Sequence, residues 1–596
     1  MIDMMFSQPD WLKNAKCEVD PYLRVAIAST LIDHEGAISV NNEFFPLIIE
    51  AKPNRIEEVL ILIGFEPTNQ VDTPASFSDS RFITARVNAI SMMELHLFDA
   101  VKRIEIGWSL HVQRQRVTHT RGAFVSAQAP VISTTSKLIG IIDNGCPFAH
   151  EAIRSPLGVT RVLSIWDQND EFGSAAMPYG MSYGRVLSRP LLKKLMTNAT
   201  VGGVLSESLC YKASGLDMLQ QGRSHGAHVL GLATGEYKYR AIGKSQTEVG
   251  KIPLADKASR SDIVFVQLPR SAIQAPSRGS QTLHLLNGLR YFVACAGKKT
   301  KDIYAVIDYG SYLGPHDATS LFERAVDELV RQVAAQGKRL HVVFAVGNGR
   351  QEHFHASFQS KKNIPKQIEL WIPPANEVSV FVEIWLYRNS KFDSLKLTTP
   401  DRKISTTCSA LNSVNSIGDI YSPVAIVSAS RLHDDQQCIV IRIGPTRVQG
   451  KYQPAQDGRW LVELQAESTN LVHCYISRGG RNFGAPRRSQ QARWKIPQNS
   501  PTGAAIDISI DYTTIGAGCG DEVMMVGSYN SWKPKESTKY SGRGPRRGGK
   551  QVNIGPARLY PGEEAQTLRG IRGIGNYSGS SYRLVGTSTA PPQAVR

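Results

Sequence analysis

Hydrophobic and polar positions divide the chain into regions with different patterns. Residues 46–106 combine short alternating runs, typical of half-buried strands, with segments that have the apolar spacing of amphipathic helices. The expected strands are 47–51, 81–87, 102–106 and one near 65–72, and the expected helices are 55–62 and 91–101. The order β-α-β-β-α-β predicts a small α+β unit.

From about residue 136, short apolar runs alternate with longer amphipathic segments. The expected strands are Leu138–Ile142, Ile263–Gln267, Ile303–Ile307 and His341–Val346, and the expected helices are Thr282–Ala296 and Ala318–Ala335, the latter with Asp317 as its N-cap. This pattern predicts an α/β fold in which helices cover both faces of a parallel sheet. Sites in such folds form at the carboxyl ends of strands, and Asp143 and Asn348 follow two of them.

Residues 355–505 interrupt that pattern with strand-like runs that have no helices between them. These runs are 367–372, 378–385, 438–443 and 461–464. They predict an inserted all-β domain, a sandwich, after which 523–526 resembles another core strand. The expected division is an N-terminal extension (1–45), the α+β unit (46–106), a linker (107–135), an α/β domain in two parts (136–354 and 506–596) and the β-rich insertion (355–505).

The composition is that of a globular protein, with 41% hydrophobic and 20% charged residues among 596. Much of the formal charge of +17 comes from two glycine-rich basic stretches, 478–493 and 543–550. Such stretches can bind nucleic acid, but no stacking aromatics or nucleic-acid motif accompany them, which favours exposed loops.

The eight cysteines form no Cys-x-x-Cys pair, which argues against a zinc site or redox motif.

The first residues show no basic segment followed by an apolar one, so no secretory signal is expected. No apolar run approaches the roughly 18 residues needed to cross a bilayer. These observations predict a soluble, cytoplasmic, bacterial-type protein without a membrane partner.

Three short blocks contain the residue types of a catalytic triad. Asp143 ends Lys137-Leu-Ile-Gly-Ile-Ile-Asp143-Asn-Gly, His225 lies in Ser-His225-Gly-Ala-His-Val-Leu-Gly, and Ser588 lies in Gly-Thr-Ser588-Thr-Ala-Pro-Pro. A serine hydroxyl needs an imidazole as general base, and the imidazole needs a carboxylate to orient it. Each residue alone is more often structural, but Asp, His and Ser occur here in an order known for such triads.

The three blocks resemble those of subtilisin-like serine peptidases (subtilases, peptidase family S8). A fourth block, Val342-Val-Phe-Ala-Val-Gly-Asn348-Gly, resembles the strand that ends in the family's oxyanion-hole asparagine, which implies that role for Asn348. The run Val-Ile-Asp308-Tyr-Gly310-Ser311 matches the family's substrate-binding segment less closely, because many members carry Asn and Ser where Asp308 and Gly310 stand. The resemblance implies that Asp308, Gly310 and Ser311 contact the substrate. His228 is expected to be a packed structural residue.

The resemblance implies a subtilisin-like sheet and a serine endopeptidase that cleaves polypeptides, with no redox cofactor and no catalytic metal. Family members often bind calcium structurally, but no ligand set can be recognised here. The N-terminal unit, with its ferredoxin-like arrangement, resembles the family's inhibitory prodomain, which is cleaved off. Cleavage is expected within about 107–135, where 113–116 and 120–122 have the composition of loops. An unrelated α+β interaction domain is the alternative.

Two features depart from the family pattern. Asn348 and Ser588 are 240 residues apart, which the β insertion explains, and eight residues follow Ser588 where relatives continue. A short serine helix can loosen the nucleophile. The alternative function is therefore a catalytically impaired relative that binds proteins through its β domain. A nucleic-acid-binding protein is a third hypothesis, and it rests on the basic stretches alone.

Overall fold

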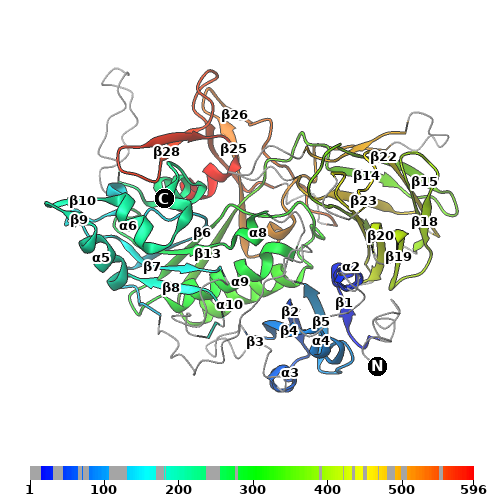
Figure 1. The fold of residues 1–596 in the computed structure, drawn as a ribbon, viewed down its shortest axis with the longest axis horizontal. Coiled ribbons are helices and arrows are strands. Elements are labelled where there is room, and N and C mark those ends of the chain that lie inside the picture. Colours follow the sequence, from blue (N-terminus) through cyan, green and yellow to red (C-terminus); the bar gives the residue numbers. More distant parts are fainter. Residues whose placement is uncertain are drawn as a thin grey trace.

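A computed structural model describes most of the chain (Figure 1). The described residues are 15–30, 44–64, 70–71, 80–106, 130–169, 180–181, 183–236, 256–274, 279–387, 392–419, 422–432, 436–447, 453–467, 469–479, 490–497, 506–548 and 555–596. Both loop-like segments within the expected cleavage region, 113–116 and 120–122, lie outside these ranges.

The centre of the molecule is a nine-stranded sheet. Its strands are β6 (Lys137–Asp143), β7 (Val162–Asp167), β8 (Arg185–Ser188), β11 (Asp262–Gln267), β12 (Asp302–Ile307), β13 (Arg339–Ala345), β25 (Val523–Asn530), β26 (Lys533–Ser537) and β27 (Arg558–Glu563). The order is β26-β25-β13-β12-β6-β11-β7-β8, with β27 also paired to β25. All pairs are parallel except β7–β8 and β25–β26. This confirms the predicted α/β class with a parallel sheet.

Helices cover both faces of this sheet. The elements concerned are α5 (Arg189–Asn198), α6 (Glu207–Ser214), α7 (His225–Thr234), α8 (Arg270–Gln274), α9 (Gly279–Ala294), α10 (Leu321–Ala335) and α11 (Ala590–Val595). Alternate residues of a strand point to opposite faces. Ile141 of β6 accordingly belongs to the same core cluster as Val229 of α7, whereas Ile142 belongs to that of Leu289 of α9. Burial on both faces explains the continuous apolar runs in the sequence.

The predicted N-cap of α10 is wrong. Ser320 is the N-cap, because its hydroxyl accepts from the Glu323 backbone N–H while the Glu323 carboxylate accepts from the Ser320 N–H. Asp317 instead accepts a hydrogen bond from the Thr319 N–H and pairs with Arg547. A serine three residues before a glutamate is itself a helix-start signal, so the sequence contained the correct alternative.

The N-terminal unit forms a five-stranded sheet of order β1-β5-β2-β4-β3. Its elements are β1 (Glu18–Val19), α2 (Pro21–Thr30), β2 (Phe44–Ala51), α3 (Ile56–Gly64), β3 (Gln70–Val71), β4 (Phe82–Asn88), α4 (Ala89–Leu95) and β5 (Val101–Ile106). The last four strands of that order have the ferredoxin-like arrangement. The helix expected over 91–101 is shorter and earlier, because Asn88 caps α4 and the chain from Val101 pairs with β2. The strand β1 shows that the 1–45 extension contributes to this sheet.

Between β13 and β25, the described residues contain strands in two antiparallel sheets. Their orders are β14-β23-β16-β21-β20-β19 and β18-β17-β22-β15-β24. The strands are β14 (His355–Gln359), β15 (Lys366–Ile372), β16 (Val380–Leu386), β17 (Phe392–Thr398), β18 (Ser405–Cys408), β19 (Ser413–Asp419), β20 (Ser422–Arg431), β21 (Gln437–Ile443), β22 (Gly458–Ala466), β23 (Leu471–Ile476) and β24 (Arg493–Lys495). We call the part of the chain from β14 to β24 the β insertion.

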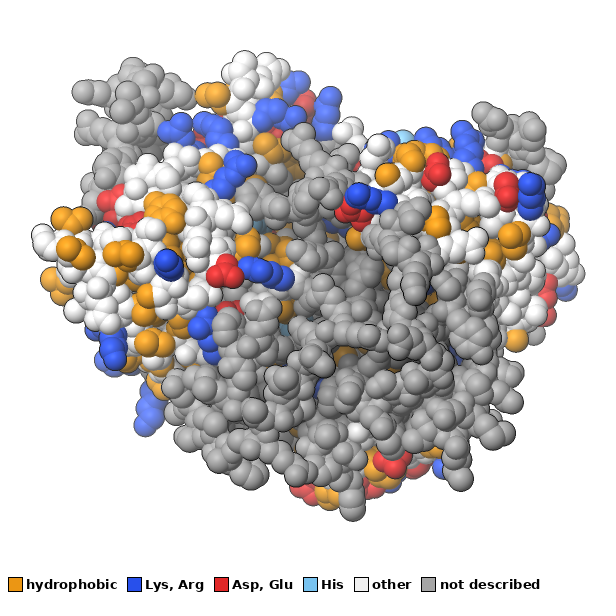
Figure 2. Space-filling model, viewed as in Figure 1, with side chains coloured by type: hydrophobic (Ala, Val, Ile, Leu, Met, Phe, Trp, Pro, Cys, Tyr) orange, Lys and Arg blue, Asp and Glu red, His pale blue; other side chains and the backbone are white. Residues whose placement is uncertain are grey.

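Two short hairpins complete the fold. The hairpin of β9 (Thr200–Val201) and β10 (Val204–Leu205) protrudes at one edge, where Figure 2 shows apolar side chains and where Val201 and Val204 are exposed. The hairpin of β28 (Ile571–Ile574) and β29 (Ser581–Leu584) contacts α7.

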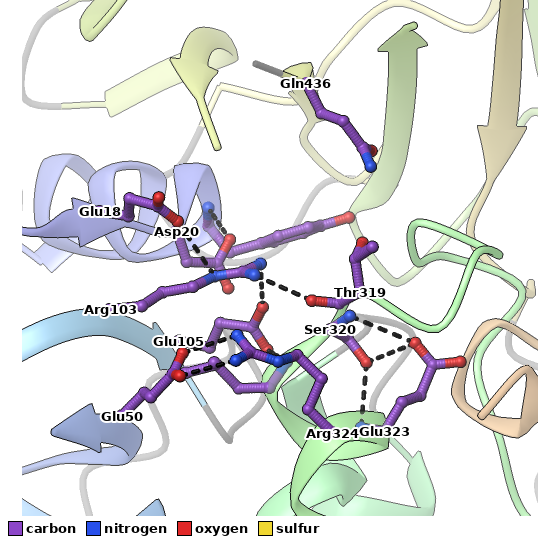
Figure 3. A network of polar contacts seen from close by, with 12 residues as sticks. Glu18, Asp20, Glu50, Arg103, Glu105, Thr319, Ser320, Glu323, Arg324 and Gln436 are labelled. Carbon is purple, nitrogen blue, oxygen red and sulfur yellow. Dashed lines mark hydrogen bonds and ion pairs between the residues drawn. The ribbon is translucent and has the colours of Figure 1, made fainter. Parts of the chain in front are cut away.

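Buried polar contacts join the N-terminal unit to the central domain (Figure 3). The Glu50 carboxylate on β2 accepts two hydrogen bonds of 2.7 Å from Arg324 on α10. The Glu105 carboxylate accepts from the Leu321 N–H at the start of the same helix (3.0 Å), where the helix dipole favours a negative charge. Arg103 donates to the Thr319 carbonyl (2.9 Å). Ser80 also bonds Glu328 in the middle of α10 (2.8 Å), and Arg290 of α9 donates to the Phe82 carbonyl (2.7 Å). The unit is therefore docked on both α10 and α9.

Candidate active site

Asp143 and His225 meet at the carboxyl end of β6. The His225 Nδ1 atom lies 2.8 Å from Asp143 Oδ2 and 3.0 Å from Oδ1, and the Asn144 N–H donates to Oδ1 (2.7 Å). Asp143 is fully buried and His225 is 7% exposed. Because a carboxylate only accepts, Nδ1 is the donor in this contact, and in the neutral imidazole Nε2 is then the acceptor. Two residues 82 positions apart are thus paired as the sequence motifs predict.

A glycine allows this pairing. Gly226 follows His225, and its N–H donates to the Asn144 carbonyl at 2.8 Å. A Cβ atom at Gly226 would lie 2.3 Å from that carbonyl oxygen. Any larger residue would push α7 away from β6, and His225 away from Asp143.

The start of α7 is held by the β28–β29 hairpin. Ser224 is the N-cap of α7, and its hydroxyl donates to Asn576 Oδ1 (2.6 Å), while Tyr582 Oη donates to the Ser224 carbonyl (2.6 Å). His228 Nε2 lies 2.8 Å from the Ile571 carbonyl, and burial lowers the pKa of His228 to about 4. His228 is therefore a neutral packing residue, as expected. Asn576 and Tyr582 have no local signal in the sequence.

Ser588 lies in a single 3₁₀ turn, Thr587–Thr589, that leads directly into α11. Both the turn and α11 contact α7, whose first residue is His225. The far end of α11 is anchored twice: Lys137 Nζ donates to the Val595 carbonyl (2.5 Å), and Arg596 pairs with Asp256 (2.7 Å). Since Lys137 begins the strand that ends in Asp143, the serine segment is tied to the element that carries the acid.

Asn348 lies just past β13 and contacts the residue before Ser588. Its Oδ1 accepts hydrogen bonds from the Thr587 N–H (2.7 Å) and hydroxyl (3.0 Å), and the Thr587 hydroxyl accepts from the Gly347 N–H (3.2 Å). Because Oδ1 accepts these bonds, the Nδ2 amide group is the part of the Asn348 side chain that can donate to another group. Nδ2 lies 3.1 Å from the position that a Cβ atom on Gly586 would take. The sequence motif did not indicate this role for Thr587, although Thr587 directly precedes Ser588 in it.

The predicted substrate segment lies beside the histidine. The Tyr309 ring is edge-on to the His225 ring, with centroids 5.5 Å apart. A Cβ at Gly310 would lie 2.7 Å from Ile515 Cδ1, and the Ser311 carbonyl accepts from the Gly516 N–H (2.8 Å). The roles of Asp308, Gly310 and Ser311 in substrate binding stay predictions.

Asp308 has an unusual environment. In the pairing of β12 with β6, Ile307 lies opposite Ile142, so the next residues, Asp308 and Asp143, are neighbours at the strand ends. Both Asp308 carboxyl oxygens are buried, and neither has a hydrogen-bond partner in the described part of the chain. Burial, and then the charge of Asp143, raise the pKa of Asp308 well above its ordinary value. A substrate contact at Asp308 would therefore come from its backbone.

Asp308 should make stability depend on pH. The pKa of Asp308 is about 3.9 in the unfolded chain and higher in the folded protein. The contribution of Asp308 to the unfolding free energy is therefore complete below about pH 4 and is lost as the pH rises through the folded pKa. Over that window the wild type should lose up to about 1.4 kcal/mol of unfolding free energy per pH unit relative to Asp308→Asn. Urea denaturation of both proteins at pH 5 and pH 8 measures this. Parallel pH dependences would contradict it.

A matched control lies at the other end of β12. Hydrogen bonds from Arg339 lower the pKa of Asp302 to about 2. Stability from Asp302 is present above its unfolded pKa and is lost as pH falls through the folded value. Asp302→Asn should therefore change the acid side of the profile and leave the Asp308 effect in place.

All eight cysteines are free thiols. The second basic stretch is not simply an exposed loop: Arg547 is fully buried, pairs with Asp317 (2.8 Å) and lies over the Trp385 ring, while Arg546 pairs with Asp521. Most of the first stretch, 480–489, lies outside the described residues.

In the described ranges, no group of three or more His, Cys, Asp or Glu side chains is arranged to hold a metal ion. Among the same residues, no helix has the length and apolarity to span a membrane.

The structure is similar to that of the Clostridium perfringens CspB protease, with a TM-score of 0.55 and 19% sequence identity. The similarity covers 77% of this chain and 80% of that chain. At this identity it shows a shared fold. No family model matches the sequence, and no curated protein matches it.

Proposed function

We propose that this protein is a subtilisin-like serine endopeptidase that cleaves polypeptides through an acyl-enzyme at Ser588. The observation that carries the proposal is the pairing of His225 Nδ1 with the buried Asp143 carboxylate, at the start of a helix that the turn containing Ser588 contacts. The motif order and the shared fold with a protease structure support it.

Each residue then has a role in the mechanism. His225 Nε2 takes the proton of the Ser588 hydroxyl as it attacks the peptide carbonyl, and Asp143 offsets the positive charge on the imidazole. The Asn348 Nδ2 group, oriented through its Oδ1 contacts with Thr587, donates to the oxyanion. His225 next protonates the leaving amine, which departs. Water, deprotonated by His225, then attacks the acyl carbonyl; the acid product departs, and His225 returns the proton to Ser588 Oγ.

Digestion of a peptide library, with the products identified by mass spectrometry, tests this proposal. The wild type should cut internal peptide bonds, and Ser588→Ala should cut none of them. The same profile would define the side-chain preference on each side of the cleaved bond.

The N-terminal unit is proposed to act as an intramolecular inhibitor, and its docking contacts make that testable. Glu50 is fully buried and pairs with Arg324 of the central domain and with Lys102 of its own unit, and the Arg324 side chain is 19% exposed. Losing the charged hydrogen bonds to Arg324 costs about 1.5–3 kcal/mol, which corresponds to roughly 10- to 100-fold weaker docking. The full-length Glu50→Gln variant should therefore hydrolyse peptides severalfold faster than the wild type.

Glu58→Gln is the control for this variant, because it removes an exposed ion pair with Arg55 in the same unit. It should leave the hydrolysis rate unchanged, since exposed pairs contribute little. Equal rates for Glu50→Gln and the wild type would argue that the docked unit does not inhibit.

A further inference from the structure

Tyr312 lies between Asn348 and the β insertion. Its hydroxyl accepts a hydrogen bond from the Asn348 backbone N–H (3.0 Å), and the residue is 4% exposed. Its ring stacks on the Phe354 ring, with centroids 4.1 Å apart and planes at 14°. One side chain therefore touches both the asparagine loop and Phe354, the residue immediately before the first strand of the insertion.

Phe354 is held where three strands of the insertion converge. It immediately precedes β14, and its carbonyl accepts hydrogen bonds from the Ile476 N–H at the end of β23 (2.9 Å) and from Trp494 Nε1 on β24 (3.1 Å). Phe354 is fully buried. The surface on which Tyr312 stacks is thus fixed by the insertion.

The loop around Asn348 fits closely against these two rings. A Cβ at Gly349 would lie 2.2 Å from Phe354 Cε1 and 2.8 Å from Tyr312 Cζ. A Cβ at Gly347 would lie 3.0 Å from Tyr312 Cε1, and Gly347 has a φ of +99°, which favours glycine. Close packing of this kind transmits small displacements, so a shift of either ring would move Asn348.

A second contact holds the Tyr312 backbone to the insertion. The Tyr312 carbonyl lies 2.8 Å from His316 Nε2, and the His316 ring stacks on Tyr475 of β23 with centroids 4.0 Å apart and planes at 11°. Both the side chain and the main chain of Tyr312 are therefore held by residues that the insertion contributes or packs against.

We propose that Tyr312 is a positioning residue through which the β insertion holds Asn348 in place for the oxyanion. This inference rests on the proposed function. Thr587 fixes the side-chain oxygen of Asn348, and Tyr312 fixes its backbone, so the amide donor is oriented from two sides. Such an effect acts in the transition state and should change kcat rather than KM.

Tyr312→Phe tests this proposal, because it removes the hydroxyl and keeps the ring that packs on Phe354. We expect kcat to fall about tenfold, the equivalent of one lost hydrogen bond, with KM within about twofold of the wild type. Tyr304→Phe is the matched control, since Tyr304 lies on β12 away from the site and stacks on His341. It should leave both constants unchanged.

A double-mutant cycle separates positioning from general loosening. In an Asn348→Ala background, where the oxyanion donor is absent, Tyr312→Phe should lower kcat no further. A tenfold loss that persists in that background, or a Tyr312→Phe enzyme with wild-type kcat, would overturn the inference and leave the proposed function intact. A wild type without hydrolytic activity would instead overturn the proposed function, and this inference with it.

Discussion

Ser588→Ala should abolish peptide hydrolysis, with kcat lowered about 10⁶-fold, the loss known for triad serines. The variant keeps the Asp143–His225 pair and the Asn348 amide but has no atom to form the acyl-enzyme. Its unfolding free energy should change by less than about 1 kcal/mol, because Thr587 and Thr589 make the hydrogen bonds that hold this turn. Steady-state hydrolysis of a fluorogenic peptide and urea denaturation measure the two quantities.

The controls for this variant separate chemistry from folding. Ser208→Ala, at an exposed position of α6, should retain full activity. His225→Ala should lose nearly as much activity as Ser588→Ala, and the double variant should lose no more, because the residues act as a unit. Substantial hydrolysis by Ser588→Ala would show that the nucleophile is a different residue.

Asn348→Ala should lower kcat about 100- to 1000-fold with little change in KM. Its Nδ2 group acts on the charge that develops in the transition state, so its loss leaves substrate binding nearly unchanged. The Thr587 N–H and hydroxyl would lose their acceptor as well, so a modest loss of stability should accompany the kinetic effect.

Steady-state kinetics on the same fluorogenic peptide give both constants for Asn348→Ala. Asn198→Ala, at the exposed end of α5, is the matched control and should behave like the wild type. A kcat within about threefold of the wild type for Asn348→Ala, or a loss confined to KM, would contradict an oxyanion role.

Helices and strands could be predicted from the sequence where the local hydrophobic pattern matches the burial of the element in the fold. The run Leu138–Ile142 before Asp143 contains no polar side chain because β6 is buried on both faces. The Asp143–His225 pairing followed from motifs that carry several residues of context. By contrast, the strand over 102–106 was predicted, but α4 ends at Leu95, well before that strand, and the apolar spacing of 91–101 gave no sign of this early end.

The remaining site residues were missed because their contacts span long stretches of sequence. Tyr312 contacts a loop 36 positions away, and Tyr582 contacts a residue 358 positions away. Arg547 was expected in an exposed basic loop, yet Asp317 compensates its charge in the interior. The charge and glycine content of a segment can be read from the segment itself. Whether one of its arginines is buried depends on a carboxylate from a distant part of the chain, here Asp317.

A fluorophosphonate probe tests the central claim most directly, because it reacts only with an activated serine. Mass spectrometry of the labelled wild type should find a single adduct, on the peptide that contains Ser588, and Ser588→Ala should remain unlabelled. A well-folded wild type that takes up no label, or takes it up at another serine, would contradict the account and favour a protein-binding role for this fold.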